Sequence, residues 1–224
     1  MAGILGFYTS KGLVKIVNIR KVARKISPDT AARLKVLFPG MPLDSVTIIY
    51  NAWLPAHIFN KAIEGMTFHN TIYVTRYHIQ HNYAGFILLI HELVHIKQIR
   101  ESGEIAFACN YGMQLLSYGG YSSKMPLENE AYAFVAHIPF DPLYYRIRHL
   151  QHQVSSADPD WEMTAMAHFL DQGIYLGLQS SNDFNIKSYI DKIRDFPDTI
   201  HPVDYPAALL HCIKYRSIEG RKDL

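Results

Sequence analysis

The sequence predicts an α+β fold with strands ahead of a long buried helix and a mostly helical C-terminal third. Three observations carry this prediction. Residues 86–96 form a nearly continuous apolar run that is interrupted by only three polar side chains. Residues 70–76 alternate and are rich in β-branched and aromatic side chains, which is typical of a strand. Beyond residue 139, proline and glycine bound several segments with helical signals.

The first region, residues 1–28, is a basic N-terminal segment without any acidic residue. Its apolar positions follow a loose helical or extended pattern. Such an arm can bind a membrane surface or nucleic acid. A solvated face on a packed segment is the more common explanation, and we favour it here. The six basic residues are Lys11, Lys15, Arg20, Lys21, Arg24 and Lys25.

The second region, residues 29–140, is the expected catalytic unit. It opens with a helix over 28–38, because Ser27 precedes Pro28 and proline is favoured in the first helical turn. Strands follow, and then the helix that contains the apolar run. A further helix is expected over 104–116, ending at a glycine-containing loop.

The third region, residues 141–224, is expected to be a helical subdomain. Asp158 and Pro159 predict the start of a helix that Gly173 closes. Two more helices are expected over 186–196 and 207–218, separated by a proline-broken stretch. We interpret the histidines of this region as surface or core residues, because they lack ligand spacing; they are His149, His152, His168, His201 and His211.

The most informative motif is His91-Glu92-Leu93-Val94-His95, which lies inside the apolar run. On a helix, residues four apart lie on one face, so both imidazoles can reach one metal ion. The glutamate next to the first histidine is then left free to act as a base. A buried helix has little reason to carry these three polar side chains unless they are paired or metal-bound. A pair of structural histidines satisfied by backbone carbonyls is the alternative.

A second helix is expected after Pro126, with Glu128 and Glu130 in its first turn. Carboxylates are favoured there by the helix dipole alone. A metal centre of this kind also needs a third protein ligand. Either explanation accounts for the two glutamates.

At this point the chain resembles a known family. HELVHIKQ, followed about thirty residues later by a helix that reads ENEAYAFVA, is similar to the gluzincin group of HExxH metallopeptidases. The likeness is nearest to short bacterial domains of that group, including those found with contractile injection systems. Residues 37–50 and 65–74 also resemble the two strands before the active helix in such domains. The resemblance thus implies a zincin-like fold, a small mixed sheet packed on the HExxH helix and a second, glutamate-bearing helix.

The resemblance implies a zinc ion held by His91, His95 and Glu128, with Glu130 as the fallback ligand. The fourth position would hold water, and Glu92 would take its proton and pass it to the leaving amine. The implied function is a zinc-dependent endopeptidase that acts on a protein or peptide, and the resemblance to domains of contractile injection systems implies a bacterial effector or toxin.

One position departs from the family pattern. Four residues after the ligand glutamate, related enzymes have Asp or Asn, which accepts the free N–H of a zinc-bound histidine, whereas this chain has Tyr132. Glu130, Asp141 or a backbone carbonyl can serve as the acceptor instead.

The group also uses a tyrosine or histidine to stabilise the transition state. The candidates here are Tyr121, Tyr132 and His137. Gln98 shares the ligand face of the active helix and either lines the cleft or lies on the surface. In the resembled fold, the strand before the active helix is an exposed edge that pairs with substrate, and residues 70–76 are expected to form it.

Composition fits one folded enzyme. The apolar fraction of 49% and the charged fraction of 19% are ordinary, and a net charge of +2 gives no reason to expect nucleic acid. Two cysteines do not form a disulfide framework, which favours a reducing compartment. No transmembrane segment and no classical signal peptide are expected, so the protein is predicted to be cytoplasmic or delivered into a host cell.

Three functional hypotheses follow from the sequence. The first is the zinc endopeptidase. The second is a catalytically inactive binding protein on the same fold, which the missing acidic residue at position 132 keeps open. The third is a metal-independent interaction module with structural histidines.

Overall fold

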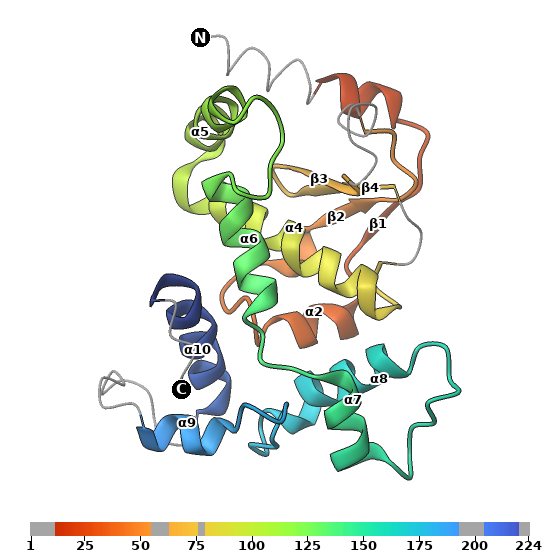
Figure 1. Cartoon of the computed structure of the whole chain (residues 1–224). Helices are drawn as coiled ribbons and strands as arrows, with labels where there is room; N and C mark the ends of the chain where they lie inside the picture. The colour runs from red at the N-terminus through yellow and green to blue at the C-terminus, as the bar shows by residue number, and fades with distance from the viewer. Residues whose placement is uncertain (1–11, 55–62, 76–78, 193–203, 220–224) are drawn as a thin grey trace. The chain divides into compact units, whose positions relative to one another are not determined.

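The computed structural model describes residues 12–54, 63–75, 79–192 and 204–219 of the chain (Figure 1). These residues fall into two compact units. Unit 1 comprises the described residues within 1–27, 42–80 and 84–133, and unit 2 comprises the described residues within 28–41, 81–83 and 134–224. The expected proline-broken stretch and His201 lie mostly or wholly outside the described residues.

Unit 1 contains a four-stranded sheet in the order β1-β2-β4-β3. The strands are β1 (Ala23–Lys25), β2 (Thr47–Ile49), β3 (Gly65–Phe68) and β4 (Thr71–Val74). β2 and β4 are parallel, whereas β1 pairs with β2 and β3 pairs with β4 in antiparallel register. The expected α+β class with a small mixed sheet is therefore confirmed.

The position of one strand was predicted wrongly. β4 covers most of the segment 70–76 and lies inside the sheet, between β2 and β3. The edge strand beside it is β3, which precedes it in the chain. The two strands form a tight hairpin, and local alternation cannot tell which arm of a hairpin will find a second partner.

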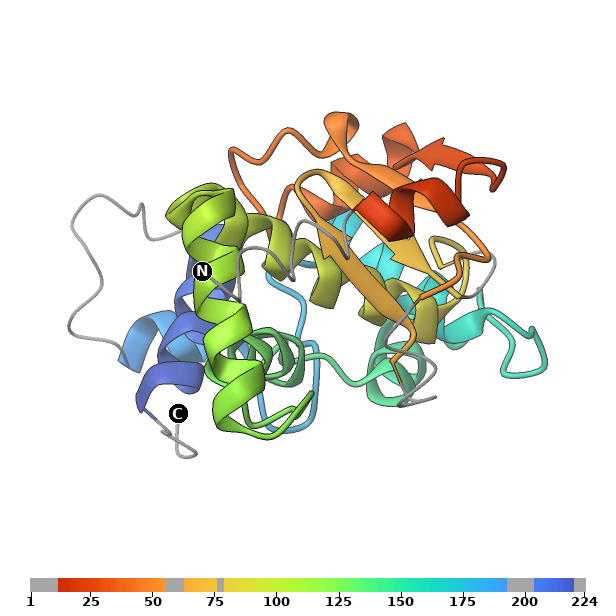
Figure 2. The same ribbon diagram turned by 90° about the horizontal axis from the view of Figure 1, so that it is seen from above.

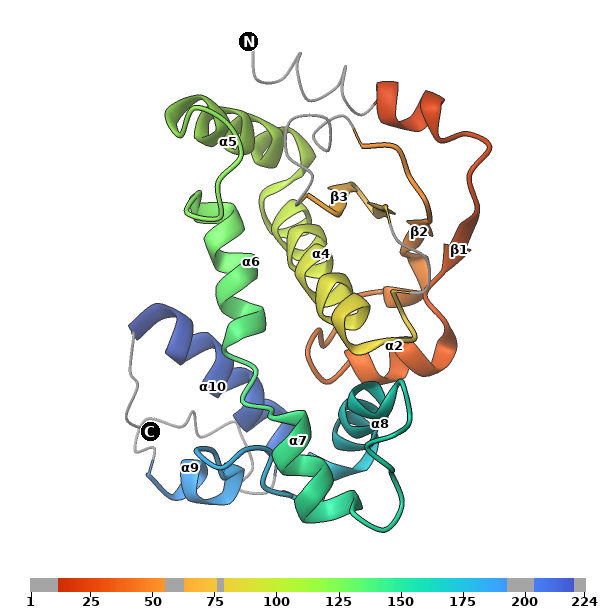
Figure 3. The same cartoon turned by 45° about the vertical axis from the view of Figure 1, so that its right-hand side comes forward.

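The helices around the site are α4 (Tyr83–Ser102), α5 (Glu104–Ser117) and α6 (Pro126–Ala136). Twelve residues of α4 are buried, as its apolar run predicts. Figures 1 and 3 show α4 lying between the sheet and the first turns of α6. Gly103 separates α4 from α5 with a φ of 84°, a conformation that glycine adopts without strain.

Unit 2 is helical. Its helices include α2 (Pro28–Leu34), α7 (Pro142–Tyr145), α8 (Trp161–His168), α9 (Ile186–Lys192) and α10 (Tyr205–Glu219), and π-helical turns extend α7 and α8. The helix that begins at Pro28 packs in this unit, where Arg33 Nε lies 2.9 Å from Asp171 Oδ2. The buried Tyr145 donates to or accepts from His168 Nδ1 at 2.9 Å and packs on Phe169.

One helix start in unit 2 differs from the prediction. The helix expected from Asp158 and Pro159 begins at Trp161, and Asp160 is its N-cap without a side-chain capping bond. The backbone N–H of Trp161 donates to the carbonyl of Asp158, so the earlier residues form a turn instead. Gly173 does end the helical stretch, as expected.

Within the described residues, no helix is both long and apolar enough to cross a bilayer.

Candidate metal centre

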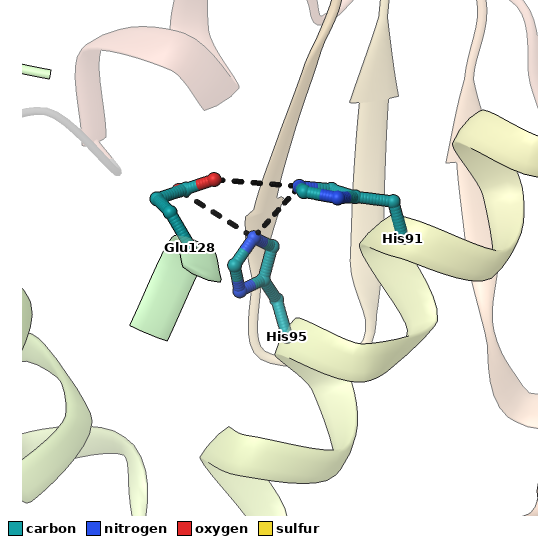
Figure 4. Close-up of side chains that lie close together, drawn as sticks. All are labelled: His91, His95 and Glu128. Carbon is teal, nitrogen blue, oxygen red and sulfur yellow. Dashed lines mark hydrogen bonds and ion pairs between the residues drawn. The ribbon is translucent and has the colours of Figure 1, made fainter. Parts of the chain in front are cut away.

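The centre lies in unit 1 and begins with two histidines of α4. His91 and His95 are one turn apart, so their side chains project from the same face of the helix (Figure 4). Their Nε2 atoms are 3.2 Å apart and both side chains are buried. Two imidazole nitrogens at this distance, with little access to water, need a shared proton or a shared cation.

Glu128 completes the cluster from the first turn of α6. One of its carboxylate oxygens lies 3.4 Å from His91 Nε2, and the other lies 3.5 Å from His95 Nε2. The carboxylate is buried like the histidines, and Figure 4 shows all three side chains converging on one point. These three residues therefore lie close enough together to hold a metal ion. The alternative ligand, Glu130, is exposed and lies outside this cluster.

Gln98 supplies the acceptor that Tyr132 cannot provide. His95 Nδ1 lies 2.8 Å from Gln98 Oε1, and an amide oxygen can only accept, so Nδ1 carries the proton. The other nitrogen, Nε2, can then offer its lone pair to a cation held between His91 and Glu128. This is the tautomer that a metal ligand requires.

The orientation of the Gln98 amide is itself fixed from α6. Its Nε2 donates to the carbonyl of Leu127 at 3.0 Å and to Glu130 Oε2 at 2.9 Å. Glu130 was expected as a direct acceptor for a histidine, and it acts one step further out, through Gln98. Asp141 does not serve this role, because its carboxylate caps α7 by accepting from Tyr144 N.

Two tyrosines donate to the Glu128 carboxylate. Tyr111 of α5 reaches one oxygen at 2.7 Å, and Tyr121 of the following loop reaches the other at 3.1 Å. Burial and the charge of Glu128 raise the pKa of both phenols well above its usual value, so they remain neutral donors. Tyr111 was not identified from the sequence. Its only signal there is its place on the helix between the two ligand-bearing segments.

The charges in the centre support one another. Burial opposes ionisation of Glu128, but hydrogen bonds with His91 and His95 outweigh it and hold the pKa of the carboxyl far below its usual range. Burial also disfavours the charged form of His95, yet the hydrogen bond with Glu128 and the charges of Glu128 and Glu92 raise its pKa to about 9. The three side chains therefore favour a positive charge between them, which a proton or a metal cation can supply.

The side chain of Glu92 extends from α4 to the edge strand β3. Its Oε2 accepts a hydrogen bond of 2.7 Å from the Thr67 hydroxyl, and its side chain is buried. A Cβ added to Gly65 would stand 2.1 Å from Glu92 Oε1, so the carboxylate occupies the space that the glycine leaves open. β3 thus fixes the position of the Glu92 carboxylate in two ways: the Thr67 hydroxyl donates to it, and Gly65 leaves room for it.

Two of the three expected stabilisers lie at the centre. The Tyr132 ring packs against the His91 ring with centroids 4.5 Å apart, and the Tyr132 hydroxyl pairs with that of Tyr121 at 2.9 Å. The third candidate, His137, follows α6 and belongs to unit 2.

Comparison with protein families, with curated proteins and with solved structures finds no match to this chain. The case for its function thus depends on the geometry of the site.

Proposed function

We propose that this chain is a zinc-dependent endopeptidase of the gluzincin type, with a zincin-like fold in unit 1. The observation that carries the proposal is the convergence of His91, His95 and Glu128 in a buried cluster next to Glu92. Two imidazoles and one carboxylate form a donor set that favours zinc and leaves a coordination position for the reaction.

The spacing of the ligand atoms fits that ion. Zinc binds nitrogen and oxygen at about 2.0–2.2 Å, so two ligand atoms at tetrahedral positions lie about 3.3–3.6 Å apart. The two imidazole Nε2 atoms are 3.2 Å apart, and they lie 3.4 Å and 3.5 Å from different oxygens of the Glu128 carboxylate, so each of these separations is close to the tetrahedral spacing. A zinc ion in this site would polarise a substrate carbonyl and make water a stronger nucleophile at neutral pH.

Glu92 is the proposed general base. Glu92 directly follows His91 on α4, and its carboxylate is buried against β3. Thr67 holds one oxygen, and the other is the one that approaches Gly65 most closely. In this position Glu92 can take a proton from water and deliver it to the leaving amine.

The neighbouring tyrosines have a distinct task. Tyr121 donates its one hydroxyl proton to Glu128, so in the pair with Tyr132 the Tyr132 hydroxyl is the donor. Tyr132, whose ring packs on His91, is therefore the proposed donor of a hydrogen bond to an oxyanion. The β3 edge, which carries the residues that position Glu92, is the proposed site where an extended peptide pairs with the sheet.

The test is hydrolysis of an unfolded protein, such as reduced casein, followed by mass spectrometry of the products. Glu92→Gln should keep zinc at the wild-type stoichiometry and abolish cleavage. Glu101→Gln is the matched control: it removes the same charge from an exposed position of α4 and should change neither property. Cleavage by Glu92→Gln at the wild-type rate would contradict the mechanism. Zinc binding without cleavage of any substrate by the wild type would favour the inactive binding protein.

A further inference from the structure

The N-terminal arm, defined here as residues 12–25, has one buried side and a large exposed one. Residues 12–17 are helical and residues 23–25 form β1. In the arm, only Val14 and Asn18 are buried. They are four residues apart and therefore lie on the same side of a helical turn.

These two residues anchor the arm firmly to unit 1. Val14 is fully buried in a cluster with Leu54, Phe68 and Tyr73. The Asn18 amide donates to the carbonyl of Trp53 at 2.9 Å, and its oxygen accepts from Trp53 N–H at 2.7 Å. The arm is thus held in place by contacts that leave its outer surface uninvolved.

The outer surface is unusually apolar for a solvated segment. Five large aliphatic side chains are exposed within ten residues, and Ile16 and Ile19 reach exposures of 70% and 78%. Trp53, next to the anchor, is also 40% exposed. Single exposed apolar residues need no explanation, but a concentration of this kind marks an interaction surface. The aliphatic residues are Leu13, Ile16, Val17, Ile19 and Val22.

The same segment is strongly basic. Lys15, Arg20, Lys21 and Arg24 are all exposed, and the chain has no acidic residue before Asp29. Among the described residues, none of these four cations forms an ion pair. Lys25 differs, because its ammonium donates to the carbonyl of Ser45 and the hydroxyl of Thr47.

We propose that the arm binds the surface of an anionic lipid membrane. Aliphatic side chains enter the boundary between headgroups and acyl chains, while lysine and arginine pair with the headgroups. Nucleic acid would use the basic residues but not five exposed aliphatic ones, since phosphate contacts dominate such binding. A second copy of this chain would bring two positive surfaces together.

α5 provides an internal comparison. It exposes Ile105, Met113 and Leu116 by 59%, 64% and 75%, yet it contains no lysine or arginine. Figures 1 and 2 show α5 and the helix of residues 12–17 at the same end of unit 1. Variants of α5 therefore test the effect of exposed apolar side chains without basic ones, and variants of the arm test the two together.

The test is co-sedimentation of the full chain with phosphatidylcholine vesicles, with and without phosphatidylserine. We expect binding to the vesicles that contain phosphatidylserine, and weaker binding as salt rises. Each basic residue near such a surface strengthens binding about fivefold, so Arg20→Glu/Lys21→Glu/Arg24→Glu should weaken it by at least about 100-fold. Ile16→Ser/Ile19→Ser should also weaken it, whereas Met113→Ser/Leu116→Ser should not.

Several outcomes would overturn this assignment. One is equal binding by the charge-reversal variant and the wild type, with circular dichroism showing both folded. Others are loss of binding only in the α5 variant, or binding of duplex DNA in preference to vesicles. A dimer in sedimentation analysis that Ile16→Ser/Ile19→Ser dissociates would assign the surface to a second copy. His91→Ala should bind vesicles like the wild type, so failure of the peptidase proposal would leave this result unaffected.

Discussion

Gln98 offers the most specific test of how the metal centre is organised. Its amide oxygen faces His95 Nδ1 at 2.8 Å, and its amide nitrogen is held by Leu127 and Glu130. Gln98→Ala removes the group that selects the ligating tautomer of His95. Loss of such an outer contact lowers metal affinity about 10- to 100-fold, which corresponds to about 1.4–2.7 kcal/mol.

An exchange of charge between positions 98 and 130 sharpens the test. In the wild type the Gln98 amide donates to Glu130 at 2.9 Å. Gln98→Glu alone replaces this donor with a second carboxylate, and because the two negative charges repel, the zinc affinity should fall. Adding Glu130→Gln restores a donor opposite the new carboxylate. The double variant should bind zinc more tightly than Gln98→Glu, since the carboxylate raises the basicity of the histidine that donates to it, although it still faces the carbonyl of Leu127.

The assay is competition for zinc against a chromophoric chelator at constant pH. Lys97→Ala is the matched control, because it lies one position away on α4 and loses only an exposed ion pair with Glu101. A zinc affinity of Gln98→Ala within twofold of the Lys97→Ala value would refute the role of Gln98. So would a double variant that binds no better than Gln98→Glu.

Three further predictions concern neighbouring residues. Gly65→Ala should retain zinc and most of the stability, because only the flexible end of the Glu92 side chain must move. It should lower the rate of peptide hydrolysis at least about tenfold, because the general base is displaced. Gly12→Ala is the control and should leave hydrolysis unchanged, since nothing lies within 4 Å of its added Cβ. Tyr111→Phe should lower the free energy of unfolding by about 1.5–3 kcal/mol in urea titration, since its hydroxyl donates to the ionised Glu128. Zinc must displace the proton on His95 below its pKa of about 9, so zinc affinity should rise about tenfold from about pH 7 to about pH 8 and level off above about pH 9; a flat profile would contradict this.

The ligand pair could be predicted from the sequence because its geometry is local. Helical periodicity alone puts His91 and His95 on one face of α4, and the apolar run around them predicts that the face is buried. Glu128 is 33 residues from His95, and only a resemblance to a family could single it out from Glu130.

The supporting contacts could not be predicted, because they join elements far apart in the chain. Gln98 and Glu130 meet across two helices, and neither has a spacing that signals the contact. Thr67 and Gly65 act on Glu92 from β3, and the place of β3 at the sheet edge depends on strand order rather than on local pattern. A tyrosine on α5 looks like any other core residue until the fold brings it to Glu128.

The central claim is that His91, His95 and Glu128 bind zinc, and elemental analysis of tag-free protein tests it most directly. The wild type should contain about one zinc ion per chain, Glu130→Ala should retain it at saturating zinc, and Glu128→Ala should lose it. No zinc in the wild type after zinc is added back, or equal zinc in Glu128→Ala, would contradict the account.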